Sequence, residues 1–346
     1  MTLATPAETT TPLAPATLPV LDLSRLDAGD VEAAAFRDEL REITHEFGFF
    51  YLVGHGIDPA LTAELLSTAA AFFGLPEAEK RAIENVNSPH FRGWTRVGGE
   101  LTQGAVDWRE QIDIGAERPA VPPGPGVPDY LRLEGPNQWP ASLPELRDVV
   151  TRWDETLSAI GMKLLQAWAV SLGAAPDVFD AAFADNPSVL IKIVKYPGRD
   201  TSEARQGVGA HKDGGVLTLL LVEPGKGGLQ VEKDGEWIDA PPVPGAFVVN
   251  IGELLEVATD GYLKATVHRV ISPAAADTRI SIPFFFNPAL DATIPIIPLD
   301  PALAGQAAGV TADPDNPIFG TYGENLLKSR LRAHPDVAAR HHPDLS

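Results

Sequence analysis

The spacing of apolar residues divides the chain into a largely helical first part and a later part rich in strands. Before about residue 187, apolar residues recur three and four positions apart, which is typical of helices with one buried face. The longest such segment, 143–172, predicts a long helix that ends at Gly173. From about 188 to 290 the spacing changes to alternation, which predicts strands separated by turns such as "KDGE".

Six short segments in this later part have the character of strands. They are "SVLIKIVKY", "VLTLLLV", "GLQVEKDGEWIDA", "GAFVVNIG", "KATVHRVIS" and "RISIPFFF". Earlier in the chain, "FGFFYLVGHGI" predicts a buried strand, and helices are predicted over 30–46, 59–73 and, after the strands, over "YGENLLKSRLRAH". Many short strands in close succession favour a β-sandwich or jelly roll. We therefore expect a mainly β protein with flanking helices, whose core the long helix braces.

The length of 346 residues permits one large domain or two. The opening segment is rich in Thr, Pro and Ala and has neither the basic nor the apolar region of a signal peptide, so we predict a flexible tail over 1–17. We expect an N-terminal region over 18–140 and a catalytic region over 141–346, packed together as one unit.

Composition narrows the classes of partner and of chemistry. A net charge of −20 argues against nucleic acid or an anionic membrane as the main partner, since both require a basic surface. The chain has no cysteine, which excludes disulfides, iron–sulfur clusters and cysteine nucleophiles. Any metal must then be bound by His, Asp, Glu or water. No segment is long and apolar enough to span a bilayer, and we expect a cytoplasmic protein.

The stretch "GVGAHKDGG" contains two candidate metal ligands beside an apolar strand. Alternate residues of a strand share a face, so His211 and Asp213 can point at one ion while Lys212 points away. His268, in the later segment "KATVHRVIS", supplies a third ligand. Two imidazoles and one carboxylate make the facial triad of non-haem Fe(II) oxygenases, which leaves metal positions open for O₂ and a cosubstrate.

The segment "RISIPFFFNP" carries a cation within a strongly apolar strand. Arg279 and Ser281 share one face, and Phe285 shares it too if no bulge intervenes. A guanidinium in such a strand is costly unless it meets an anion, and its fork beside a hydroxyl suits a carboxylate. We predict that the pair binds a carboxylate and that Phe285 lines a pocket; the alternative is a surface arginine on an edge strand.

Taken together, "HKD…HRV…RISIPFFFNP" resembles the isopenicillin N synthase-like family of iron(II)- and 2-oxoglutarate-dependent oxygenases. The resemblance extends over most of the chain. "LPVLDLS", "FGFFYLVGHGI" and "FFGLPEAEK" are similar to the family's N-terminal region, and "GGLQVEKDGEWIDAPPVPGAFVVNIGE" is similar to its β core. "YGENLLKSRLRAHPDV" is similar to its C-terminal helix. Several independent motifs in the right order make the match specific.

The resemblance implies a double-stranded β-helix and a defined set of cofactors. His211, Asp213 and His268 would bind Fe(II), and Arg279 and Ser281 would hold the distal carboxylate of 2-oxoglutarate. Tyr196, in "VKYPG", matches a tyrosine that often hydrogen-bonds the same carboxylate. The implied reaction uses O₂ to oxidise an unactivated C–H bond of a small molecule, by hydroxylation or by desaturation or cyclisation, with succinate and CO₂ as co-products. Family membership also suggests secondary metabolite biosynthesis.

The sequence departs from the family pattern at two positions. Val194 stands where many relatives carry Asn, which removes one polar contact to the cosubstrate. Glu253, in "NIGE", stands where Asp is more common, which we interpret as a structural change.

Several residues are candidates for contacts with a small-molecule substrate. Lys192 shares a strand face with Val194 and Tyr196 and would favour an acidic substrate; alternatively it extends to the rim of the pocket. In this family the irregular region 85–138 borders the active site. Its candidates are Phe91, Arg92, Trp94, Trp108 and Gln111. We expect the protein to be a monomer.

Two other functions remain as alternatives. One is an oxidase of isopenicillin N synthase type, in which the Arg-x-Ser pair holds the substrate and a glutamine near the C-terminus can meet the iron. This chain ends in "ARHHPDLS" without that glutamine, which favours 2-oxoglutarate. The other is a non-catalytic jelly roll that binds a small acid, against which the complete triad argues.

The remaining histidines are not expected to take part in catalysis, with one position left open. His334, His341 and His342 are expected to lie in a polar tail. His45 lies in a helical segment and His55 in a turn. The open position is His90, which lies in a long loop that could cover a pocket.

Overall fold

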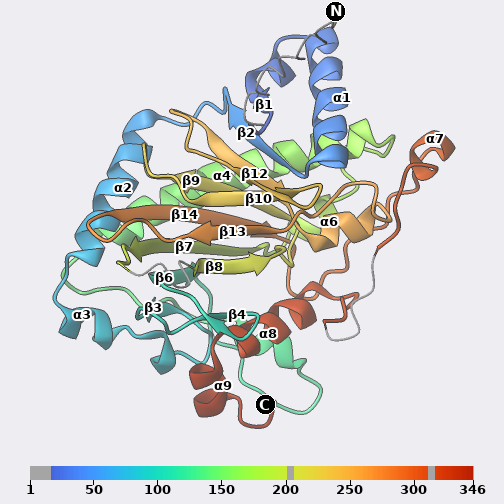
Figure 1. Ribbon diagram of the computed structural model, residues 1–346. Coiled ribbons are helices and arrows are strands. Elements are labelled where there is room, and N and C mark those ends of the chain that lie inside the picture. Colours follow the sequence, from blue (N-terminus) through green and yellow to red (C-terminus); the bar gives the residue numbers. More distant parts are fainter. Residues whose placement is uncertain (1–16, 201–205, 311–315, 346) are drawn as a thin grey trace, which may run out of the picture.

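Two β-sheets packed face to face form the centre of the protein, and helices surround them (Figure 1). The computed structural model describes residues 17–200, 206–310 and 316–345. The predicted tail therefore lies almost entirely outside the described residues. The large sheet consists, in spatial order, of β1 (Val20–Asp22), β2 (Phe49–Val53), β12 (Phe247–Ile251), β9 (Leu217–Val222), β14 (Thr278–Asn287), β7 (Ser188–Pro197), β6 (Glu110–Gly115) and β3 (Gly93–Thr95).

The small sheet covers one face of the large one. Its strands are, in spatial order, β11 (Glu236–Asp239), β10 (Leu229–Lys233), β13 (His268–Ile271) and β8 (Gln206–His211). A separate two-stranded ribbon is formed by β4 (Leu101–Thr102) and β5 (Ala105–Val106). All strand pairs are antiparallel except β1 with β2. The prediction of a mainly β chain with a jelly-roll core is confirmed.

The helices follow the predicted pattern at the start of the chain and add elements near its end. The α-helices are α1 (Asp30–Glu46), α2 (Pro59–Phe73), α3 (Glu77–Ala82), α4 (Glu145–Ser171), α5 (Asp180–Phe183), α6 (Glu253–Ala258), α7 (Pro301–Ala304), α8 (Tyr322–Ala333) and α9 (Pro335–His341). Within the described residues, three short 3-10 helices span Leu23–Asp27, Asn85–Asn87 and Asp129–Leu133. In the parts of the chain that the structure describes, no helix has both the length and the apolar character needed to cross a bilayer.

Strands from the N-terminal region complete both edges of the large sheet. β1 and β2 extend one edge beyond β12, and β6 and β3 extend the other edge beyond β7 (Figure 1). The chain before residue 140 and the chain after it therefore share one hydrogen-bonded sheet. The C-terminal helices α8 and α9 lie beside the β6–β3 edge and contact β4 and the 3-10 helix at Asn85–Asn87.

The long helix α4 packs against the outer face of the large sheet, as predicted for the 143–172 segment. Trp153, Leu157 and Leu164 on its buried face belong to the same apolar cluster as Phe284 and Phe286 of β14. This burial is the main source of the helix's stability, because each large apolar side chain removed from water contributes about 1.5–3 kcal/mol.

Gly161 of α4 lets the helix approach β14 closely. A Cβ added there would lie 2.6 Å from the ring of Phe286, which is itself buried in the core. We expect Gly161→Ala to lower the free energy of unfolding by about 1–3 kcal/mol through overpacking, despite the higher helix propensity of Ala. Urea denaturation measures this, with Glu155→Ala on the exposed side of α4 as the control. A Gly161→Ala protein as stable as the wild type would contradict this packing.

The face of the large sheet that meets the small sheet carries the residues singled out from sequence. Residues paired across neighbouring strands point to the same side. Arg279 pairs with Tyr196, Ser281 with Val194, and Phe285 with both Leu190 and Thr218. Val194 and Tyr196 pack with apolar residues of β8, β10 and β13, which identifies this side as the interior between the sheets. We call it the inner face.

Candidate active site

Three candidate metal ligands converge at one end of the small sheet. His211 is the last residue of β8 and lies directly opposite His268, the first residue of β13. The Nε2 atoms of the two rings lie 3.6 Å and 3.7 Å from Oδ1 of Asp213. One nitrogen or oxygen from each of the three residues falls within 4.8 Å of the others, a spacing that can hold one metal ion.

The sequence argument for Asp213 needs one correction. Asp213 lies beyond the end of β8, so strand alternation does not direct it toward His211. Its carboxylate is positioned by hydrogen bonds instead. Oδ2 accepts from Oγ1 of Thr218 at 2.6 Å and from Nδ2 of Asn250 at 2.8 Å, both on the inner face, which leaves Oδ1 directed at the two histidines.

Hydrogen bonds also orient the two imidazole rings. Nδ1 of His211 lies 2.8 Å from the carbonyl of Gly209, and Nδ1 of His268 lies 3.1 Å from the carbonyl of Thr266. Because a carbonyl can only accept, each Nδ1 carries the proton and each Nε2 presents its lone pair to the centre. The resulting N, N, O donor set suits a divalent transition metal.

The charges of the triad are consistent with metal binding. Burial alone would raise the pKa of Asp213, but the two neighbouring imidazoles and the hydrogen bond from Thr218 outweigh it and hold the pKa well below its ordinary value. Burial lowers the pKa of His268 to about 4, so this ring is neutral at physiological pH. Burial also lowers the pKa of His211, but the nearby negative charge of Asp213 and the carbonyl of Gly209 have the opposite effect and the net shift is upward.

Arg279 lies on the inner face with an incomplete set of partners. Only 1% of its surface is exposed, and Nη1 donates to Oγ of Ser281 at 3.0 Å. Its guanidinium carbon lies 4.9 Å from the centre of the Tyr196 ring. Nε and Nη2 are buried and have no hydrogen-bond partner among the described residues. Burial lowers the pKa of Arg279, and a buried guanidinium with two free N–H groups is matched to an anion.

Comparison with family models identifies this arrangement. A model of the "non-haem dioxygenase in morphine synthesis N-terminal" region matches residues 18–142, and a model of the "2OG-Fe(II) oxygenase superfamily" matches residues 186–288. The chain belongs to the 2OG-Fe(II) oxygenase superfamily. The resemblance inferred from the motifs is confirmed, as are the enzyme class and the use of Fe(II) and 2-oxoglutarate.

Individual relatives agree with this assignment. The chain is 37% identical to the 2-oxoglutarate-dependent dioxygenase frbJ of Dothideomycetidae sp. (strain 11243), over 93% of this chain and 91% of the relative. It is 33% identical to homoarginine-6-hydroxylase 2-ODD-C23.1 of Arabidopsis thaliana, over 82% and 87% of the two chains. Among solved structures, a full-length Neurospora crassa protein in complex with alpha-KG and thymine superposes with a TM-score of 0.72 at 27% identity, covering 90% of this chain and 95% of that one.

The candidate substrate residues of this oxygenase divide into two groups. Gln111, Lys192 and Phe285 lie on the inner face, and Arg92 reaches the same face, where its guanidinium occupies the space above Gly115. Lys192 is not the free cation that an acidic substrate would need. Its Nζ lies 2.6 Å from Glu100 and 3.5 Å from Asp113, so two carboxylates neutralise it.

Trp94 is positioned away from the inner face, and Phe91 contacts the C-terminal segment. Trp94 pairs with Ile112, which points to the opposite side of β6, and its indole N–H donates to Glu110 at 3.1 Å. The ring of Phe91 stacks on His342 with centroids 5.3 Å apart. Trp108 lies beside β8 and donates its backbone N–H to Gln206 at 3.2 Å. Trp94 therefore packs on the side of β6 that is remote from the inner face, whereas Phe91 lies against His342 and His334.

A buried cluster of charged residues adjoins the inner face of this oxygenase, and sequence reasoning missed most of it. Its carboxylates and cations form mutual ion pairs and are nearly inaccessible to solvent; the members are Glu100, Asp107, Arg109, Asp113, Lys192 and Arg330. The sequence "DWREQID" could have indicated this buried cluster, because polar residues occupy alternate positions of a predicted strand there. Alternation on a strand places them on one face, which here is the interior.

His334 was expected in a polar tail and instead lies completely buried beside this cluster. Its Nε2 lies 3.6 Å from Glu100, and its Nδ1 lies 3.1 Å from the amide nitrogen of Asn85. The histidine is held by the end of α8, which contributes Arg330 to the same cluster. The C-terminal segment is thus part of the packed interior, because it supplies polar partners to groups more than two hundred residues earlier.

The burial of His334 predicts a pH dependence of stability. Burial lowers the pKa of His334 to about 4, whereas an unfolded histidine titrates near pH 6.5. The unfolded chain therefore binds a proton first, and this contribution to stability, about 3 kcal/mol, is present above pH 6.5 and lost as pH falls toward 4. Chemical denaturation between pH 7 and 4 should show a shallower decline for His334→Gln than for the wild type. Parallel curves for the two proteins would contradict this assignment.

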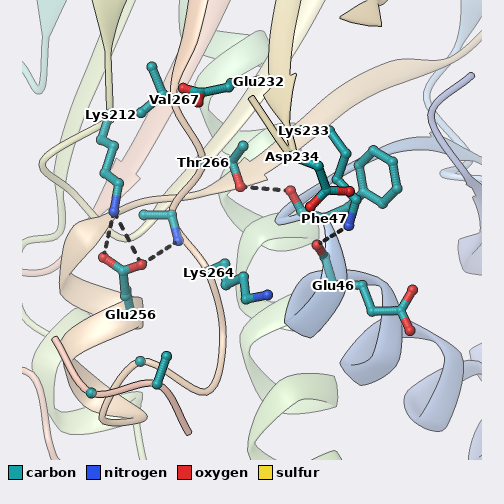
Figure 2. Close-up of a pocket in the computed structure, with 14 residues that line it drawn as sticks. Glu46, Phe47, Lys212, Glu232, Lys233, Asp234, Glu256, Lys264, Thr266 and Val267 are labelled. Carbon is teal, nitrogen blue, oxygen red and sulfur yellow. Dashed lines mark hydrogen bonds and ion pairs between the residues drawn. The ribbon is translucent and has the colours of Figure 1, made fainter. Parts of the chain in front are cut away.

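A pocket of about 330 Å³ is lined by residues that include Lys212, Glu256 and Thr266, and none of the three metal ligands lines it (Figure 2). Lys212 points into it and pairs with Glu256 at 3.0 Å, and Glu256 also accepts from the backbone N–H of Ala265 at 3.1 Å. Lys212 thus pairs with a carboxylate outside the triad, in agreement with the prediction that it is not directed at the metal. The bridge joins the segment after His211 to the segment before His268, and it supports the site from outside.

Proposed function

We propose that this oxygenase hydroxylates a C–H bond of a small polar molecule at a centre formed by His211, Asp213 and His268. These residues would hold Fe(II) through two Nε2 atoms and one carboxylate oxygen. The observation that carries the proposal is the convergence of three preoriented donor atoms within 4.8 Å, on the same inner face as Arg279.

Arg279 and Ser281 would bind the distal carboxylate of 2-oxoglutarate. The two unpartnered N–H groups of Arg279 can donate two hydrogen bonds to a carboxylate, and the hydroxyl of Ser281 can donate a third. Tyr196, whose ring lies against the guanidinium, would restrict its orientation. Val194 lies between these groups on the inner face and offers no polar contact, so the carboxylate depends on the arginine and serine.

Iron held by His211, Asp213 and His268 would supply the activation of O₂ that couples decarboxylation of 2-oxoglutarate to succinate and CO₂ with oxidation of the substrate. The chain positions the reactants and keeps water from the site. We propose that regions 18–140 and 141–346 act as one unit in positioning the reactants, because β6 of the first region and β7 of the second form adjacent strands of the pocket wall. A monomeric state and a cytoplasmic location stay predictions from the sequence.

The names of the relatives guide the choice of first substrates. One relative is a homoarginine-6-hydroxylase, and one structural neighbour was solved with thymine. Both compounds are small and carry several hydrogen-bonding groups. An acidic group alone is a poor match for Lys192, which is already paired with two carboxylates.

Succinate formation tests the proposal. The protein is supplied with Fe(II), O₂ and 2-oxoglutarate, and L-homoarginine and thymine are the first candidate substrates. We expect succinate and CO₂ to be released only when Fe(II) and 2-oxoglutarate are both present. Substrate oxidation with ascorbate but without 2-oxoglutarate would instead indicate an oxidase of isopenicillin N synthase type, and the absence of any O₂ consumption would indicate a binding protein.

A further inference from the structure

Four buried side chains at one end of the inner face keep polar atoms without partners. The acceptors are Oε1 of Gln111 and Oδ1 of Asp113, and the donors are Nε of Arg92 and Nη2 of Arg330. All four residues are at least nine-tenths buried. A buried polar atom without a hydrogen bond costs about 1–3 kcal/mol, so four in one place call for a ligand or ordered water that offers both donors and acceptors.

These four residues form a single group in space. Gln111, Asp113 and Gly115 occupy alternate positions on β6 and point to the inner face. A Cβ at Gly115 would overlap the guanidinium of Arg92, so Arg92 fills the next place in this row. Nη1 of Arg330 approaches from α8 to 3.8 Å from Oδ1 of Asp113, too far for a hydrogen bond.

Neighbouring hydrogen bonds leave the free atoms available to a ligand. The amide nitrogen of Gln111 donates to Oδ2 of Asp113 at 2.8 Å, and this bond leaves the two remaining acceptors, Oε1 of Gln111 and Oδ1 of Asp113, without a donor. Lys192 is 3.5 Å from Oδ1 of Asp113 and is bound more closely by Glu100. The group therefore presents two acceptors beside two guanidinium groups.

A row of inner-face residues connects this group with the metal ligands. Asp113 pairs with Lys192 on β7, and the next β7 residue on the same face is Leu190. Leu190 pairs with Phe285 of β14, and Phe285 pairs with Thr218 of β9, whose hydroxyl donates to Asp213. Leu190 and Phe285 are partly exposed although they point inward. β6 and β9 are three strands apart, roughly 14 Å at the usual strand spacing. Side chains extend into this separation from both strands, so a ligand side chain of several bonds spans what remains between the charged group and the triad.

The mixture of charges restricts the class of ligand. A lone carboxylate would suit Arg92 and Arg330 but would meet the charge of Asp113 and the carbonyl of Gln111. A lone ammonium would suit Asp113 and Gln111 but would meet two guanidinium groups. An ammonium and a carboxylate on one carbon satisfy both halves, because each then meets groups of opposite charge.

We propose that this group binds the α-ammonium and α-carboxylate of an amino-acid substrate. The carboxylate contacts Arg92 and Arg330, and the ammonium contacts Asp113 and Gln111. The oxidised C–H bond then lies on the side chain, several bonds from the α-carbon. This inference rests on the proposed function, since it takes the triad as the place of oxidation.

Calorimetry on the protein loaded anaerobically with Fe(II) and 2-oxoglutarate tests the inference. The probes are the proteinogenic L-amino acids with L-ornithine, L-citrulline and L-homoarginine, and the N-acetyl and α-carboxamide forms of each that binds. We expect at least one free amino acid to bind and each capped form to bind at least about tenfold more weakly, since a charged hydrogen bond contributes about 1.5–3 kcal/mol. Failure of every free amino acid to bind, or equal binding of the capped forms, overturns the inference.

Two variants on the same strand sharpen this test. Asp113→Asn removes the charge that faces the ammonium, and we expect it to weaken amino-acid binding by about tenfold or more. Glu110→Gln is the matched control, because Glu110 is equally buried and ion-paired but points to the opposite face of β6. The affinity of the Glu110→Gln protein for the amino acid should stay within about twofold of the wild-type affinity. Equal effects of the two variants would contradict the assignment.

A further variant and a second readout separate the possible failures. If Asp113→Asn does not fold, Arg92→Lys keeps the charge but removes the fork, and the same loss of affinity is expected. Succinate formation without added amino acid reports on the proposed function alone. If succinate is formed and no amino acid binds, the inference fails while the proposed function stands; if an amino acid binds and no succinate forms under any condition, the proposed function fails.

Discussion

Replacing Asp213 with alanine is expected to reduce Fe(II)-dependent turnover of 2-oxoglutarate by at least about 100-fold. Asp213 supplies the only carboxylate among the three converging ligands, and its removal leaves two imidazoles to hold the metal. Loss of a residue that merely supports a ligand already costs about 10–100-fold in affinity or activity. The measurement is the rate of succinate formation, together with the iron content of the protein after dialysis.

The control for this experiment is Asp154→Ala. Asp154 lies on α4, on the outer side of the large sheet, and its carboxylate accepts a hydrogen bond from the Ser158 hydroxyl at 3.1 Å. Turnover by this variant should stay within about twofold of the wild type. An Asp213→Ala protein that retains iron and full turnover would exclude the triad as the metal site.

Replacing Arg279 with alanine is expected to weaken the binding of 2-oxoglutarate by about 100-fold or more. The guanidinium is buried beside Ser281 with two N–H groups free, and truncating one partner of a buried charge pair costs about 2–5 kcal/mol. Arg279→Lys should lie between the wild type and the alanine variant, because it keeps the charge but loses the fork. The measurement is the Kd of 2-oxoglutarate with Mn(II) in place of iron.

Arg269→Ala provides the comparison. Arg269 lies on β13 of the small sheet, where it donates to Gln230 at 2.8 Å and covers the ring of Trp237. Its loss should leave the Kd of 2-oxoglutarate unchanged. If Arg279→Ala binds 2-oxoglutarate as tightly as the wild type does, the carboxylate is held elsewhere.

The parts of the site that follow from local pattern were accessible from sequence. Arg279, Ser281 and Phe285 share the inner face because the pairing of β14 with β9 is continuous from Ser281 to Phe286, so simple alternation holds. His211 and Asp213 were identified through their spacing, although strand alternation does not apply to Asp213, which lies beyond the end of β8. Its direction depends on Thr218 and Asn250, which no local pattern connects to it.

Other features depend on contacts between distant segments. β8 lacks an apolar pattern because Gly207 and Gly209 pack directly against Tyr196 and Thr102, so backbone rather than side chains fills the space. Arg330 and His334 resemble residues of a solvated helix end, and only their partners around Glu100 and Asp113 explain their burial. Periodicity predicts which face is apolar, and it cannot identify charged residues that neutralise one another inside the fold.

The position of a bound metal tests the central claim most directly. A crystal grown anaerobically with Mn(II) and 2-oxoglutarate would locate the metal by its anomalous scattering. We predict one peak within about 2.0–2.4 Å of Nε2 of His211, Nε2 of His268 and Oδ1 of Asp213, with the distal carboxylate of 2-oxoglutarate on Arg279. A metal bound among Glu100, Asp107 and Asp113 instead, or 2-oxoglutarate away from Arg279, would contradict the account.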